Sequence, residues 1–101
     1  MDLVEFHQAL CSDQKPQAID KFFDQSICLY SLLDTNYSKD LDIKIHEKKN
    51  DCNFEIIPNH DNIDISYMEQ MLTGLEVNYF SHKFVVSATK SDKGIIIHLA
   101  E

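Results

Sequence analysis

The chain has 101 residues, and its 9 lysines and 17 acidic residues, without any arginine, give a formal net charge of −8. This length suffices for a single domain over residues 1–101 and is too short for two. Hydrophobic residues make up 44% of the chain and charged residues 26%, which is typical of a globular domain and not of an acidic disordered tail. With only two glycines, a glycine-rich phosphate-binding loop is excluded, and the negative charge disfavours direct binding of nucleic acid.

The sequence also bears on the compartment. The first residues lack the basic segment and apolar stretch of a signal peptide, and no run reaches the roughly 18 apolar residues that a membrane span needs. Cys11, Cys28 and Cys52 are odd in number and form no Cys-x-x-Cys pair, which favours free thiols over a disulfide framework. We therefore expect a cytoplasmic protein that does not bind a membrane.

Two helices are expected in the first third of the chain. Asp2 and Glu5 have the spacing of a capping box, which begins a helix that runs to about Cys11. Pro16 is tolerated in a first helical turn but not in a helix interior, so a second helix begins there and continues to Leu33. The apolar residues that recur at helical spacing in this second helix are Ile19, Phe22, Phe23, Ile27, Tyr30 and Leu33.

A β-hairpin and a third helix are expected next. Residues 41–46 and 52–57 alternate between apolar and polar side chains, which predicts two half-buried strands joined by a polar turn. A second capping-box pattern, at Ser66 and Glu69, predicts a third helix that continues through Leu72.

The remaining residues predict further strands. Residues 75–80 suit either a strand or a continued helix, and we favour the strand because Gly74 suits the left-handed position that closes a helix. Residues 84–89 and 95–99 are rich in β-branched side chains and flank a turn in which Gly94 suits the left-handed position of a bulged hairpin. The order α-α-β-β-α-(β)-β-β predicts an α+β fold, with a single antiparallel sheet and the helices packed on one face.

Five histidines and three cysteines raise the question of a metal site, but their spacing matches no zinc motif. A site would have to assemble from distant residues, namely His46, His60, His82 and His98. On its strand His98 shares a face with Ile96, away from the more apolar face, so a position at the surface or core edge is the simpler interpretation. No nucleophile motif such as Gly-x-Ser-x-Gly is present. We therefore expect no catalytic residue, no metal and no cofactor.

The second helix has a broader apolar coat than one packed face requires. At intervals of roughly 100°, Cys28 falls on the far side with Lys21, and Leu32 lies at the edge of the apolar arc. Either the first helix covers this excess or another molecule does, since exposed apolar surface commonly marks an interface. Met68 and Met71 in the third helix pose the same alternative between an interaction surface and core filling.

These observations favour a small acidic protein-binding module, such as an inhibitor, adaptor or immunity-type protein, that occupies the surface of a partner protein. The acidic surplus would speed its encounter with a partner that has a basic surface. We do not expect an enzyme. Two alternatives are kept: a small enzyme or metal-binding protein that uses the scattered histidines, and a self-associating structural subunit, that is, a homo-oligomer such as a homodimer.

Overall fold

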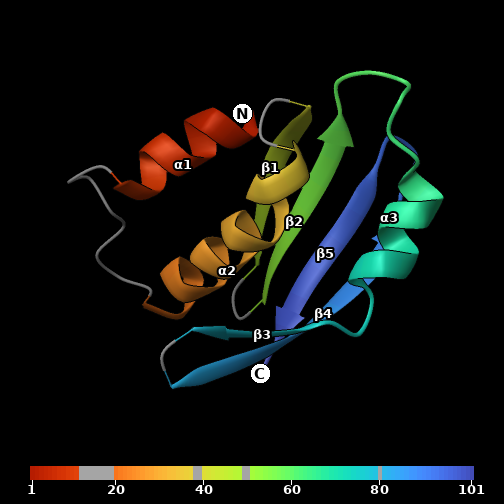
Figure 1. The fold of residues 1–101 in the computed structure, drawn as a ribbon. Coiled ribbons are helices and arrows are strands. Elements are labelled where there is room, and N and C mark those ends of the chain that lie inside the picture. The colour runs from red at the N-terminus through yellow and green to blue at the C-terminus, as the bar shows by residue number, and fades with distance from the viewer. Residues whose placement is uncertain (12–19, 38–39, 49–50, 80) are drawn as a thin grey trace.

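The computed structural model describes residues 1–11, 20–37, 40–48, 51–79 and 81–101. Over these residues the chain forms the helices α1 (Leu3–Cys11), α2 (Asp20–Tyr37) and α3 (Ile65–Leu72), and the strands β1 (Leu41–Lys48), β2 (Asp51–Pro58), β3 (Glu76–Tyr79), β4 (His82–Lys90) and β5 (Ile95–Ala100). The strands form one antiparallel sheet in the order β1-β2-β5-β4-β3 (Figure 1). The predicted α+β fold and its element order are confirmed, including the strand within residues 75–80. The predicted start of the second helix at Pro16 lies outside the described residues.

The two predicted helix caps had different outcomes. Asp2 caps α1, because its Oδ1 accepts a hydrogen bond of 2.7 Å from the backbone N–H of Glu5. The predicted cap of α3 at Ser66 is wrong: Asp64 occupies that position, and its Oδ1 accepts from Tyr67 N at 3.1 Å. The expected reach of Glu69 back to the cap is replaced by a tertiary contact, in which its Oε2 accepts a hydrogen bond of 2.5 Å from Lys90 N at the end of β4.

All three helices lie on one face of the sheet. The ring of Phe6 in α1 meets Phe54 of β2 edge-on, with centroids 6.3 Å apart. Met68 and Leu72 of α3 join the same buried cluster. The side chains of the strands that point into this cluster are Leu41, Ile43, Phe54, Ile56, Phe84, Val86, Ala88, Ile95, Ile97 and Leu99. Because side chains alternate along a strand, the opposite face of the sheet carries the intervening residues, which are mostly polar but include Val85 and Ile96.

The orientation of α2 differs from the helical-wheel prediction. Cys28, expected on the far side, is buried, because this side of α2 lies toward the sheet: Asp24 Oδ2 is 3.3 Å from His82 Nε2 on β4. The opposite side of α2 faces α1. There the ring of Tyr30 on α2 stacks on the ring of His7 on α1, with the ring centroids 4.3 Å apart. The sheet and α1 therefore cover α2 from two sides, and Leu32 is half-buried against the core.

The two glycines have different structural roles. Gly74 follows α3 with φ of 85°, which confirms the predicted left-handed position. The same prediction for Gly94 is wrong, since it has no positive φ. Gly94 is buried, and a Cβ atom there would lie 1.9 Å from the carbonyl oxygen of Ile56. Close approach of two backbones, and not a left-handed conformation, requires glycine at this turn.

The N-terminal residues lie along the outer edge of β1. The backbone N–H of Ile43 donates to the carbonyl of Met1 at 2.5 Å, and the amino group of Met1 lies 3.3 Å from the carbonyl of Ile43. Asp2 forms an isolated bridge with Asp42. This pairing covers part of an edge that would otherwise offer unpaired backbone groups to another strand.

Candidate functional site

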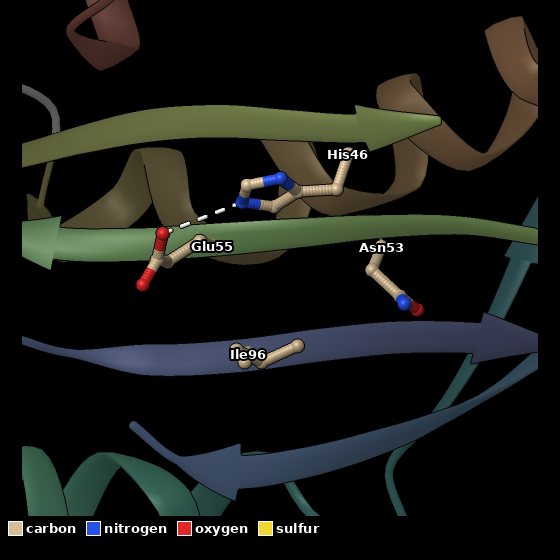
Figure 2. A pocket seen from close by; sticks show the side chains of 4 residues that line it. All are labelled: His46, Asn53, Glu55 and Ile96. Atoms are coloured by element: carbon tan, nitrogen blue, oxygen red, sulfur yellow. Dashed lines mark hydrogen bonds and ion pairs between the residues drawn. The ribbon is translucent and has the colours of Figure 1, made fainter. Parts of the chain in front are cut away.

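The face of the sheet opposite the helices is not covered by any of the described elements. Its centre consists of residues that face each other across the four strands β1, β2, β5 and β4. We define the open face as three neighbouring cross-strand rows, which are Lys44–Glu55–Ile96–Thr89, His46–Asn53–His98–Ser87 and Ala100–Val85. Figure 2 looks onto part of this face, with helices behind the strands.

Glu55 anchors the first row. Its side chain is only 18% exposed, and its Oε1 lies 3.3 Å from Nε2 of His46, which reaches diagonally across from β1 (Figure 2). Its other oxygen, Oε2, accepts a hydrogen bond of 3.4 Å from the hydroxyl of Ser91 in the β4–β5 turn. The carboxylate of Glu55 is therefore held by a residue of β1 and by a residue of the β4–β5 turn. It positions the imidazole of His46, which is more exposed, over the sheet.

The second row is joined by a hydrogen bond between neighbouring strands. His98 Nδ1 on β5 lies 2.9 Å from Asn53 Oδ1 on β2, a geometry in which the ring N–H donates to the amide oxygen. His46 and Asn53 are directly opposite each other on β1 and β2. Two imidazoles thus lie on either side of one amide.

An open hollow lies between these side chains. Its volume is about 360 Å³, and it is lined by His46, Asn53, Glu55 and Ile96 (Figure 2). Small-molecule sites typically surround most of their ligand. A hollow formed on a sheet surface by four side chains instead suits a side chain that projects from another protein.

The open face combines apolar side chains with balanced charge. Ile96 is 37% exposed and Val85 is 41% exposed, and both project from the central and neighbouring strands. Lys44 and Glu55 are the charged residues of the three rows apart from the histidines, and they lie opposite each other. With neutral histidines these rows carry no net charge, in contrast to the −8 of the whole chain.

The structure does not bring the four candidate histidines together. His46 and His98 lie on the open face, whereas His60, in the loop after β2, pairs with Asp40 at 3.0 Å. His82 lies between two carboxylates at the other end of the sheet, at 3.3 Å from Asp24 and 2.8 Å from Glu101. Among the described residues, no group of three or more His, Cys, Asp or Glu side chains could hold a metal ion.

The four residues considered as an interaction surface also lie apart. Cys28 and Met68 are buried in the core, so burial removes them from any surface of this fold. Leu32 is half-buried against the core, and Met71 is 39% exposed on the outer side of α3. Desolvation by burial, with a smaller contribution from Asp24, raises the pKa of the free Cys28 thiol.

Sequence reasoning did not identify Asn53, Glu55 or Ile96 as members of a site. The alternation in residues 52–57 already placed Asn53 and Glu55 on the polar side of a strand, and Ile96 was assigned to the face of His98. The missing information was the pairing of β2 with β5, which brings Asn53 beside His98 and Glu55 beside Ile96.

Within the described ranges, no helix has the length and apolar character required to cross a membrane. Comparisons with protein-family models, with curated proteins and with solved structures found no match to this chain.

Proposed function

We propose that this chain is a protein-binding module, of the kind represented by inhibitors, adaptors and immunity-type proteins, and that its contact surface is the open face of the sheet. The observation that carries the proposal is the exposure of Val85 and Ile96 on a face of the sheet that no described element covers. Sheet side chains of this size are usually buried by a second layer. Apolar side chains surrounded by polar ones are typical of the centre and rim of a protein interface.

The polar residues of the open face support binding over catalysis. Glu55 is held by His46 and Ser91, and Asn53 is held by His98, so these side chains are ordered before any partner arrives. Ordered side chains lose less conformational entropy on binding. The hollow between them is open, and it offers a place for one projecting side chain of the partner.

The chain is proposed to act in the cytoplasm and without a cofactor. The buried thiol of Cys28 is free, which suits a reducing compartment.

The test is a pull-down from native cell extract, with the full chain as bait. Ile96→Glu introduces a charge at the centre of the open face, and Met71→Lys changes an equally exposed apolar residue on α3. We expect the wild type and Met71→Lys to capture the same protein and Ile96→Glu to lose it. Capture that is unaffected by Ile96→Glu, or that is lost with Met71→Lys alone, would remove the open face as the contact surface.

A further inference from the structure

The charge on the open face indicates which kind of protein covers it. Asp42, Glu76 and Lys83 lie on the same face at the margins of the sheet, outside the three rows, and Lys83 Nζ pairs with Glu76 Oε2 at 3.1 Å. With Lys44 and Glu55 included, the described part of this face has two lysines and three acidic residues, so its net charge is −1. The net charge of the whole chain is −8. The excess negative charge therefore lies elsewhere on the molecule.

This distribution favours a partner surface that is close to neutral, such as the same face of a second copy. A basic partner would bind where carboxylates are in excess, and the open face has almost none in excess. Two copies of a chain with a charge of −8 repel each other over most of their surfaces. On the open face that repulsion is small, because the described charges sum to only −1, and this face also exposes Val85 and Ile96.

The dimensions of the sheet are compatible with a two-fold dimer. The five strands contain 35 residues, which at about 3.3 Å per residue and a strand spacing of about 4.8 Å give roughly 550 Å² per copy and roughly 1,100 Å² in total. That total is at the lower limit for specific interfaces, which is typical of weak and reversible association. The edge of β1 is partly covered, and β3 at the other edge has only four residues, so face-to-face stacking is a better arrangement than edge-to-edge pairing.

We propose that the open face binds a second copy of this chain, face to face, to give a homodimer with two stacked sheets. The inference rests on the proposed function, because it names the partner of the same surface. Lys83 pairs with Glu76, and Lys44 lies opposite Glu55, so a copy with the same pattern meets a face whose only unbalanced described charge is that of Asp42. The apolar contacts come from Val85 and Ile96 of both copies.

The experiment is sedimentation velocity of the full chain from about 1 to 200 μM, at about 50 and 500 mM salt. We expect the mass to rise with concentration from the protomer value of 11.7 kDa to twice that value. Dimerisation should become tighter at the higher salt concentration, since salt screens the repulsion between two acidic copies. Binding to a basic partner would show the opposite salt dependence.

Variants locate the interface. Ile96→Glu, a change at an outward position, should weaken dimerisation at least about tenfold, and Met71→Lys on α3 should leave it unchanged. Circular dichroism and thermal melting establish that each variant is folded. A wild type that stays at the protomer mass up to about 200 μM overturns the inference, and so does a dimer that Met71→Lys dissociates while Ile96→Glu does not.

The two proposals fail in distinguishable ways. If the wild type is a monomer but Ile96→Glu abolishes capture of another protein from the extract, the proposed homodimer is wrong and the proposed protein-binding function is supported. If Ile96→Glu changes neither the mass nor the capture, both proposals are wrong.

Discussion

Gln25 on α2 donates a hydrogen bond of 2.8 Å from Nε2 to the backbone carbonyl of Leu99 on β5, 74 residues away in the sequence. The ladder between β2 and β5 ends one residue earlier, at the pair Asn53 and His98. A buried side-chain amide therefore satisfies a strand carbonyl just beyond the end of that ladder. This contact fixes α2 against the inner face of the sheet.

Gln25→Glu should destabilise the protein in a pH-dependent manner. At pH 7 the new carboxylate would face the Leu99 carbonyl without a donor, and we expect the free energy of unfolding to fall by about 3 kcal/mol. Burial would raise the carboxyl pKa above its unfolded value, so the loss should shrink as pH falls and the folded state takes up a proton. Urea denaturation between about pH 4 and 7 measures this. Gln25→Leu, which cannot titrate, is the control, and equal pH profiles for the two variants would contradict the account.

The two glycines provide a matched pair of substitutions. Gly94→Ala places a methyl group against the Ile56 carbonyl, where the backbone of β2 cannot move freely, so a loss of about 3 kcal/mol or more is expected. Gly74→Ala meets no atom within 4 Å and should cost only about 1 kcal/mol through its positive φ. Thermal melting of both variants gives the comparison. A larger loss of stability for Gly74→Ala would mean that the backbone conformation, and not close backbone contact, determines how costly these substitutions are.

Much of the fold follows from local patterns in the sequence. Alternation in residues 41–46 and 52–57, and the β-branched residues near the C-terminus, are sufficient to predict the strands and their inner faces. The orientation of α2 was not predictable in the same way, because Gln25 and Ser26 are polar and yet buried. A helical wheel that follows only apolar residues therefore rotates the buried face away from Cys28.

The candidate site depends on contacts between distant strands. The outward position of His98 could be predicted from its own strand, and its partner Asn53 could not, since β2 and β5 are separated by α3, β3 and β4. Strand order is determined by packing of the complete sheet and leaves no local signal. The open hollow beside Ile96 forms only when the strands are paired in that order.

Leu32→Asp tests whether the contacts of this half-buried residue lie within the protomer. Because Leu32 packs against the core, we expect a loss of about 1–3 kcal/mol and a lower melting temperature at every protein concentration. Ser31→Asp, one residue earlier at an exposed position of the same helix, should change stability by no more than about 0.5 kcal/mol. A Leu32→Asp variant that keeps its stability and loses oligomeric mass would instead place Leu32 in an interface.

The buried thiol of Cys28 should titrate later than an ordinary cysteine. Burial, followed by the negative charge of Asp24, raises its pKa above the ordinary value of 9.0. Alkylation of Cys28, followed by peptide-resolved mass spectrometry, should therefore be slower in the folded protein than in urea at the same pH. Between the unfolded pKa of about 9.0 and the higher folded pKa, the Cys28 thiol stays protonated in the folded state and loses its proton in the unfolded state. The free energy of unfolding is therefore unaffected by this thiol below pH 9.0 and falls as pH rises above it. Urea denaturation from about pH 8 to 10 under reducing conditions should show a steeper decline for the wild type than for Cys28→Ser, whose hydroxyl does not titrate in this range. Parallel declines, together with equal alkylation rates in the folded and unfolded states, would show that the Cys28 thiol is accessible to solvent.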